Sequence, residues 1–423
     1  MGGSTGVARA VPRQGDALPL PLLVLLAALS AAVVAQGGYH LPGRVLAASV
    51  TGLALLLALR TRPRLTPVMA ACAALALWAV VRGTASGTPW ATVAAVGVFA
   101  AAAYVAERSD ARQRELCASV LIGIGTLAAL TGWAAVVWRI PSWSTVAEGL
   151  TRASSTLTYP NALAALCAAT AVLAVARPSA PHTAAASVLM TGLGATLSRA
   201  GALALLVGLV VLGLLGSWRR IAPPVLGAAV AVAALSPSFP VGPPSPVVAV
   251  AGLVAGVAVA VGAARLPRSA AVVLVVGAAS FAAFAGRLGG RWSLSSPDRT
   301  GAAGAALDLV RANPLFGVGP GNGWFTFLRD GHSRVMRYAH DEYLQVLVEL
   351  GAIGLALLGC VLFAVFRAVR RRTGGPWAGA VAALAVLAVH SGFDFLWHLP
   401  VTLLVAGVCT GLATPVHTSE EHP

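Results

Sequence analysis

The chain has 423 residues, of which 58% are hydrophobic and only 10% are charged. Soluble globular domains carry about 25% charged residues, so the composition excludes a soluble fold of this length. The formal net charge of +15 comes from arginine, since the chain contains no lysine, and most arginines stand in short clusters between apolar runs. That pattern is typical of membrane topology signals and argues against a nucleic-acid-binding protein.

Apolar runs recur along nearly the whole chain, and each can cross a hydrocarbon core of about 30 Å as a helix. Helices satisfy their own backbone hydrogen bonds in lipid. The sequence therefore predicts an all-α fold, a polytopic transmembrane helical bundle of about 12–14 spans with one large extracytoplasmic loop containing short helices. We place spans at 18–36, 43–60, 66–82, 89–106, 115–138, 161–176, 182–197, 199–217, 221–236, 245–263, 268–286, 347–367, 377–392 and 399–414.

The distribution of arginine predicts the orientation of the spans. With the N-terminus in the cytoplasm, the inside segments contain 17 arginines and the short outside segments contain 5. Positive charges concentrate in cytoplasmic loops, whereas long loops escape this rule. We therefore expect a multi-pass protein of the cytoplasmic (inner) membrane. Its predicted parts are N-terminal spans (1–144), central spans (145–286), a large extracytoplasmic loop (287–346), C-terminal spans (347–414) and a polar tail (415–423).

Two features could suggest a secreted protein. The first apolar run follows Arg9 and Arg13 like a signal peptide, but the many spans behind it favour an uncleaved first helix. The five cysteines fall in or at the ends of apolar runs and form no CxxC motif. They are interpreted as small packing residues.

Two arginines of the central part lie close to apolar runs. Arg152 precedes the sixth span, and Arg199 stands between the seventh and eighth. A charge there is costly unless it has a partner or reaches the interface. The side chains either extend to the membrane surface or bind phosphate, whose oxygens match the planar fork of arginine.

The large loop is the most polar part of the chain. Its residues Arg299–Ala312 read as a short helix that Asp298 can cap and Pro314 ends. Such a helix lies at the membrane surface or covers a cavity. Glycines then alternate with other residues, beginning with Gly317 and Gly319. Such a turn is either a tight connector or a cradle of backbone N–H groups for an anion.

The segment His340-Asp341-Glu342-Tyr343 begins a helix that we expect to run through Gly351 into the twelfth span. Neutral imidazole can take a proton from an attacking hydroxyl, so His340 is a candidate base. The alternative is a polar residue at the membrane interface. His390, Asp394 and His398 recur at four-residue spacing, which could form a metal face. We favour instead the pairing of Asp394 with an arginine of the loop.

As an ordered set, these segments resemble the O-antigen ligase and O-antigen polymerase superfamily, membrane glycosyltransferases that use polyprenyl-diphosphate-linked glycans. The similarity covers roughly residues 145–400. The family's usual His-Asn pair reads His340-Asp341 here. The matching segments are Arg152 with Tyr159-Pro160-Asn161-Ala162, Leu197-Ser198-Arg199-Ala200-Gly201, Asp298-Arg299-Thr300, Asn313-Pro314-Leu315-Phe316-Gly317-Val318-Gly319-Pro320-Gly321, Ala339-His340-Asp341-Glu342-Tyr343-Leu344-Gln345 and Glu349-Leu350-Gly351-Ala352-Ile353-Gly354-Leu355.

The resemblance implies a glycan transfer that needs no metal or other cofactor. It implies that His340 is the catalytic base and that Arg199, Arg152 and Arg299 bind the diphosphate. The implied partners are a polyprenyl-diphosphate-linked glycan donor, a glycan, lipid or wall-polymer acceptor, and membrane lipids, with no nucleic acid. Supporting roles fall to Asp341, Tyr343, Gly317, Gly319 and Asp394.

Other functions fit parts of the same sequence. A polymerase of the superfamily would join repeat units where a ligase attaches glycan to another acceptor. A transporter or flippase of anionic lipid-linked glycans would use the arginines along its path, but the polar residues gather on one predicted face of the membrane. A scaffold in a polysaccharide machine would need no catalytic residue at all.

Overall fold

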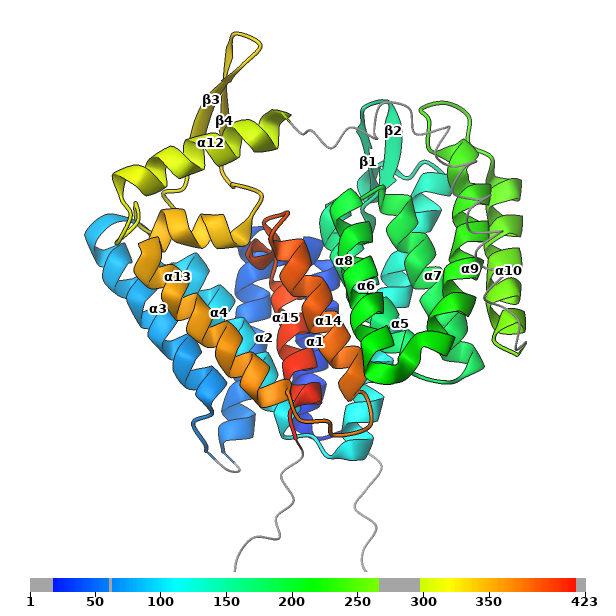
Figure 1. Ribbon diagram of the computed structural model, residues 1–423, viewed down its shortest axis with the longest axis horizontal. Helices are drawn as coiled ribbons and strands as arrows, with labels where there is room; N and C mark the ends of the chain where they lie inside the picture. The colour runs from blue at the N-terminus through cyan, green and yellow to red at the C-terminus, as the bar shows by residue number, and fades with distance from the viewer. Residues whose placement is uncertain (1–17, 61–62, 266–296, 416–423) are drawn as a thin grey trace, which may run out of the picture.

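The computed structural model describes residues 18–60, 63–265 and 297–415. They form a bundle of helices with two short β-hairpins at one end, which confirms the predicted all-α class (Figure 1). Every predicted span coincides with a helix except 268–286, which lies outside the described residues. The helices are α1 Leu20–Val34, α2 Leu41–Leu59, α3 Pro67–Ser86, α4 Trp90–Glu107, α5 Ala111–Val137, α6 Pro160–Val175, α7 Ala180–Thr196, α8 Arg199–Leu212, α9 Trp218–Leu235, α10 Pro246–Ala263, α12 Pro297–Ala312, α13 Glu342–Val369, α14 Trp377–Ser391 and α15 Pro400–Ala413.

The strands were not predicted from the sequence. β1 (Ser144–Ala147) and β2 (Leu150–Ala153) form one antiparallel hairpin, and β3 (Phe325–Arg329) and β4 (His332–Met336) form the other. Each is a two-stranded ribbon, which gains its stability from the surface on which it rests. Figure 1 places both hairpins at the same end of the bundle.

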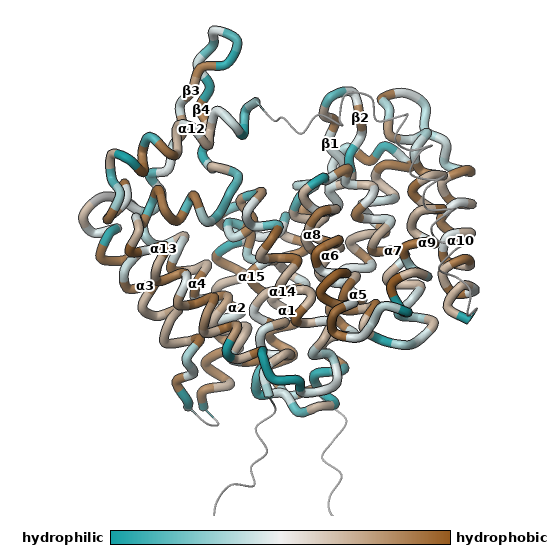
Figure 2. The backbone as a smooth tube through the Cα atoms, viewed as in Figure 1, coloured by the Kyte–Doolittle hydropathy of each residue, from teal (hydrophilic) through white to brown (hydrophobic). Residues whose placement is uncertain are grey.

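The length and hydropathy of the helices agree with a multi-pass membrane protein. Among the described residues, 7 helical segments are long and apolar enough to cross a membrane, and further apolar helices are shorter. The shorter α6 is buried along its whole length and packs against α5, α7, α8 and α14. Polar residues gather at the two ends of the bundle, and apolar residues fill the middle (Figure 2).

Helices α14 and α15 occupy the centre of the bundle (Figure 1). α15 packs against α4 and α1, α14 packs against α6 and α8, and α13 packs against α3 (Figure 1). The first and last spans of the chain are therefore neighbours. The turn between α14 and α15 is held among helices from all parts of the sequence.

The loop helix α12 begins slightly earlier than expected. It starts at Pro297, so Asp298 lies within the first turn instead of capping the helix from outside. The Asp298 carboxylate forms an ion pair with Arg329 of β3. The side chain of Phe327 packs so close to Gly301 of α12 that a Cβ there would lie 2.3 Å from the ring. The loop therefore folds as one unit of helix and hairpin.

The expectation of a continuous helix into the twelfth span was wrong. α13 is broken at Gly351, which has φ 70° and ψ −171°. Residues other than glycine rarely adopt this conformation, and a Cβ at Gly351 would lie 2.1 Å from the Leu315 carbonyl oxygen. The segment before the break crosses the bundle end, and the rest of α13 descends through the bundle (Figure 1).

Candidate active site

A buried carboxylate lies at the centre of a polar cluster at one end of the bundle. Asp394 follows α14 and has no solvent exposure. Its Oδ1 lies 3.0 Å from Nδ1 of His340. Its Oδ2 accepts hydrogen bonds from the hydroxyl of Tyr159 at 2.6 Å and from the amide of Asn161, and lies 3.4 Å from the Arg299 guanidinium. The expected pairing of Asp394 with an arginine of the loop is thus present.

These side chains come from four separate segments. Tyr159 and Asn161 flank the proline that starts α6, where φ is already fixed for a helix. Arg299 lies in the first turn of α12, and His340 immediately precedes the N-cap of α13. Tertiary packing alone brings them to Asp394.

The surroundings of Asp394 favour its ionised form. Burial alone would raise its pKa, but the hydrogen bond and charge of His340, the charge of Arg299 and the Tyr159 hydroxyl hold the pKa below its usual value. Burial, followed by the charge and hydrogen bond of Asp394, raises the pKa of Tyr159 well above its usual value. Tyr159 therefore remains a hydrogen-bond donor.

The backbone presents the imidazole of His340 in an unusual way. His340 has φ 55°, a left-handed conformation that is uncommon outside glycine. The next residue, Asp341, caps α13 by accepting hydrogen bonds from the N–H groups of Tyr343 and Leu344. Because Asn caps helices as well as Asp does, the departure from the family's His-Asn pair preserves this local geometry.

The contact with Asp394 also differentiates the two ring nitrogens. A carboxylate accepts the Nδ1–H of His340, which leaves Nε2 as the nitrogen that can accept a proton. The His340 side chain is 16% exposed. Asp341, one of the expected supporting residues, caps α13, and the carboxylate that contacts the imidazole is that of Asp394.

The structure places Arg152 on β2, ahead of α6. Its Nε donates to the Thr196 carbonyl at 2.8 Å. Its NH2 group lies 3.4 Å from the Asn161 side-chain oxygen. Arg152 therefore connects the end of α7 to the cluster around Asp394.

Arg199 is the first residue of α8 and is exposed. α7 ends where Leu197 adopts φ 53°, and Ser198 caps α8 by accepting from the Gly201 N–H. This turn begins at Thr196, the residue whose carbonyl holds Arg152. Arg199 thus lies on the segment that adjoins the cluster, while Arg152, Arg299 and His340 belong to its hydrogen-bonded core.

Stacked aromatic rings form one wall of the site. Phe395 stacks on Tyr159 at 5.0 Å and on Tyr338 at 4.6 Å between ring centroids. The ring of His340 meets Phe395 edge-on at 5.0 Å. Tyr338 in turn packs against His398 at 4.2 Å. The imidazole of His340 is thus in contact with both Phe395 and Asp394.

The glycine-rich turn is a connector. The N–H groups of Gly317, Gly319 and Gly321 donate hydrogen bonds within the protein, so these three groups do not form an anion cradle. Gly317 donates to the Asn313 carbonyl and Gly319 donates to the Glu349 carbonyl. Gly321 donates to the Glu349 carboxylate at 3.0 Å. The turn inserts into the break in α13 and satisfies carbonyls that the interrupted helix leaves unpaired.

Tyr343, the remaining supporting residue, donates its hydroxyl to the Ala388 carbonyl at 2.8 Å and so ties α13 to α14.

The three residues of the suggested metal face lie in separate environments. His398 lies 3.3 Å from Glu342, Asp394 faces His340, and His390 is buried within α14. In residues 18–60, 63–265 and 297–415, no three potential metal ligands of the His, Cys, Asp or Glu type gather.

Several residues of this region were not selected from the sequence as site residues. Tyr159 and Asn161 contact Asp394 directly, and Phe395 contacts His340. Tyr159 and Asn161 could have been recognised from the polar Tyr-Pro-Asn sequence at the start of an apolar run. Phe395 could not have been recognised, because an aromatic residue beside a span is ordinary in a membrane protein.

The family model described as O-antigen ligase matches residues 184–359. This match confirms the resemblance found in the sequence. The matched region contains Arg199, Arg299 and His340, while Arg152 and Asp394 lie on either side of it. No significant match was found among curated proteins.

Proposed function

Because residues 184–359 match the O-antigen ligase family model, we propose that this protein is a membrane glycosyltransferase of the ligase type. It transfers a glycan from a polyprenyl-diphosphate carrier to an acceptor hydroxyl on the outer face of the cytoplasmic membrane. The contact of His340 with Asp394, beside Arg299 and Arg152, carries the proposal. It supplies a base and cationic groups in one place.

The proposed reaction begins with the proton of the acceptor hydroxyl. Nε2 of His340 takes this proton, and the carboxylate of Asp394 stabilises the resulting imidazolium through Nδ1. The acceptor oxygen forms a bond to the anomeric carbon of the donor sugar. The bond between that carbon and the diphosphate oxygen breaks, and its electron pair leaves with polyprenyl diphosphate. Direct displacement inverts the anomeric configuration.

The arginines are proposed to bind the diphosphate and stabilise the charge that develops on it. Arg299 is suited to this role because its side chain is 37% exposed and its contact to Asp394 is long, at 3.4 Å. Arg152 directs its fork to the oxygens of Thr196 and Asn161, and the contact to Asn161 places its charge beside the cluster around Asp394. Arg199 would add a third cation. Preorganised cations at a leaving diphosphate are an effective form of catalysis.

A polymerase of the same superfamily would use the same cluster, so the two reactions differ in the acceptor. Transport is less well supported. The cluster lies at one end of the bundle, and buried hydroxyls within the spans, such as those of Thr170 and Thr191, donate to carbonyls of their own helices. Such hydroxyls do not offer a polar path through the membrane.

Glycan transfer in membranes that contain a lipid-diphosphate-linked glycan tests the proposal. Wild type is compared with His340→Ala and Arg199→Ala at matched expression, and released polyprenyl diphosphate is measured with the product. We expect release and transfer in wild type only. Full activity of His340→Ala would eliminate the proposed base, and uptake of donor without release of diphosphate would favour transport.

A further inference from the structure

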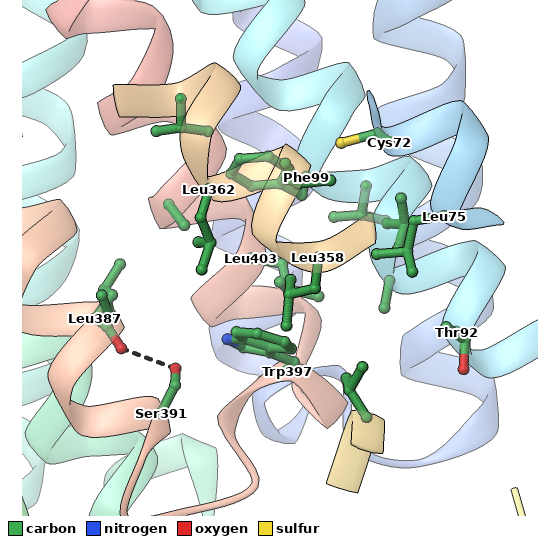
Figure 3. Close-up of a pocket in the computed structure, with 18 of the residues that line it drawn as sticks. Cys72, Leu75, Thr92, Phe99, Leu358, Leu362, Leu387, Ser391, Trp397 and Leu403 are labelled. Atoms are coloured by element: carbon green, nitrogen blue, oxygen red, sulfur yellow. Dashed lines mark hydrogen bonds between the residues drawn. The ribbon is translucent and has the colours of Figure 1, made fainter. Parts of the chain in front are cut away.

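An apolar cavity of about 450 Å³ lies beside the transfer site. Its lining includes Tyr343 but neither the proposed base nor the arginines assigned to the diphosphate. Its walls come from α3, α4, α13, α14 and α15, and Figure 3 shows apolar side chains from these helices facing one another across it. The walls include Leu75, Phe99, Leu358, Leu387 and Leu403. Nothing in the proposed transfer reaction uses this space.

The cavity reaches the outer surface of the bundle at α13, where two of its lining side chains are exposed. Helices α13 and α14 are tied at one end by the Tyr343 hydroxyl, which donates to Ala388, and at the other by the Trp377 indole, which donates to Val369 at 2.8 Å. Between these ties, Leu362 and Phe366 line the cavity and are also 42% and 60% exposed. An apolar chain in the membrane can therefore enter without crossing a polar surface.

One end of the cavity is basic. Arg44 of α2 and His398 line it there, next to Trp397. The Arg44 NH2 group donates to the Tyr39 carbonyl at 2.9 Å and more weakly to the His398 carbonyl at 3.5 Å. Its Nε is buried and has no hydrogen-bond partner within the described chain. A buried donor without an acceptor is costly, so this group favours a ligand that supplies one.

The neighbouring acid does not neutralise Arg44. The Glu342 carboxylate accepts from the backbone N–H of Trp397 and lies 3.3 Å from Nδ1 of His398. Among the described residues, no carboxylate forms an ion pair with Arg44. The arginine thus leaves positive charge at the end of a lipid-sized apolar space.

We propose that this cavity is a binding site for an anionic glycerophospholipid. Its phosphate accepts hydrogen bonds from Arg44, whose planar fork suits phosphate oxygens, and one acyl chain enters between α13 and α14. The site is distinct from the diphosphate site, because the stacked rings of His398, Tyr338 and Phe395 stand between Arg44 and His340. Binding of this lipid does not depend on the transfer reaction.

Photocrosslinking of the purified full chain in neutral detergent tests this site. The probe is phosphatidylglycerol with a diazirine in one acyl chain, and peptide mapping identifies the labelled residues. We expect labels on the facing sides of α13 and α14. The labelling yield should be about tenfold lower in Arg44→Gln, since losing a hydrogen bond to a charged group weakens binding by about that factor. Arg44→Lys should retain most of the labelling, because it keeps the charge.

Three controls make the result specific. Arg60→Gln changes an exposed arginine at the other end of α2 and should label like wild type. A diazirine-bearing diacylglycerol has the same chains without phosphate, and its labelling should not depend on Arg44. Ala385→Trp fills the cavity and should remove the labels of both lipids.

Equal labelling of wild type and Arg44→Gln by the phosphatidylglycerol probe would overturn the proposal. An equal loss in Arg299→Gln would also overturn it, since it would place the lipid phosphate at the transfer site. No glycan donor is present in this assay, so its outcome is independent of whether the protein transfers glycan.

Discussion

The carboxylate of Asp394 acts through its neighbours, because it is fully buried and cannot itself reach an acceptor in solution. Three neutral or charged donors and the Arg299 cation surround it. That is more than burial of a single carboxylate requires. The arrangement is best explained if the carboxylate must stay ionised to orient the imidazole of His340 and to stabilise its protonated form.

Asp394→Asn should therefore reduce glycan transfer by about 10²–10⁴-fold, the usual range for loss of an oriented general base. The substitution keeps the size of the side chain, so donor binding should change far less than turnover. Initial rates at saturating and limiting donor separate the two effects.

The combination of Asp394→Asn with His340→Ala identifies the route of this effect. If Asp394 acts through His340, Asp394→Asn should lower the transfer rate little further once the imidazole is gone. Effects of residues that work as a unit are not additive. Additive losses in the double variant would show that Asp394 serves the reaction by another route, such as the position of Arg299.

At the scale of elements, the break in α13 determines where His340 lies. The Val348 and Glu349 carbonyls at the break accept from the N–H groups of Val318 and Gly319, and the Leu350 carbonyl accepts from the Trp78 indole at 3.0 Å. The glycine-rich turn thus supplies the donors that an unbroken helix would have supplied. The short first segment of α13 can then cross the bundle end and present His340 to Asp394.

Gly351→Ala should disrupt this arrangement. A Cβ at Gly351 would collide with the Leu315 carbonyl oxygen at 2.1 Å, and φ 70° with ψ −171° is strained for alanine. We expect destabilisation of about 1–3 kcal/mol or more, together with reduced transfer. The thermal unfolding midpoint in detergent and the transfer rate measure the two effects.

Gly359→Ala is the matched control in the same helix. A Cβ at Gly359 meets nothing within 4 Å, so alanine there should leave stability unchanged or raise it by about 0.5–1 kcal/mol. If both variants behave alike, the break at Gly351 does not depend on its glycine.

At the scale of the whole molecule, hydropathy predicted the helices well because each apolar run must be buried in lipid or protein. It could not reveal the break at Gly351, since the run of apolar residues continues across it. The hairpin strands of four or five residues gave no distinct pattern. Polar residues beside apolar runs indicated His340, Arg152 and Arg199 as site candidates, and the family resemblance added Arg299.

Their partners could not be predicted, because the contacts join distant parts of the chain. His340 and Asp394 are 54 residues apart, and Tyr159 and Asp394 are 235 residues apart. Periodicity and motif spacing report on local structure, whereas these contacts follow from the packing of α6, α12, α13 and α14. The four-residue spacing of His390, Asp394 and His398 was misleading for the same reason, since α14 ends before Asp394.

The distribution of arginine predicts the orientation of the bundle, and this prediction can be tested on the whole protein. The β3–β4 hairpin lies at the same end as the site, and Leu328 near its tip is 79% exposed. Arg371 lies in the arginine-rich connection between α13 and α14, which the positive-inside rule assigns to the cytoplasm. The two positions should therefore face opposite sides of the membrane.

Cysteine labelling in intact cells distinguishes the two sides. A membrane-impermeant maleimide should label Leu328→Cys in intact cells, and it should label Arg371→Cys only after lysis. The native cysteines make a suitable background, since four are buried and Cys360 lies within α13, where an aqueous reagent has no access. The reverse pattern would place His340 on the cytoplasmic side, where a nucleotide-activated donor could reach it. The side of the membrane would then no longer favour a lipid-linked donor.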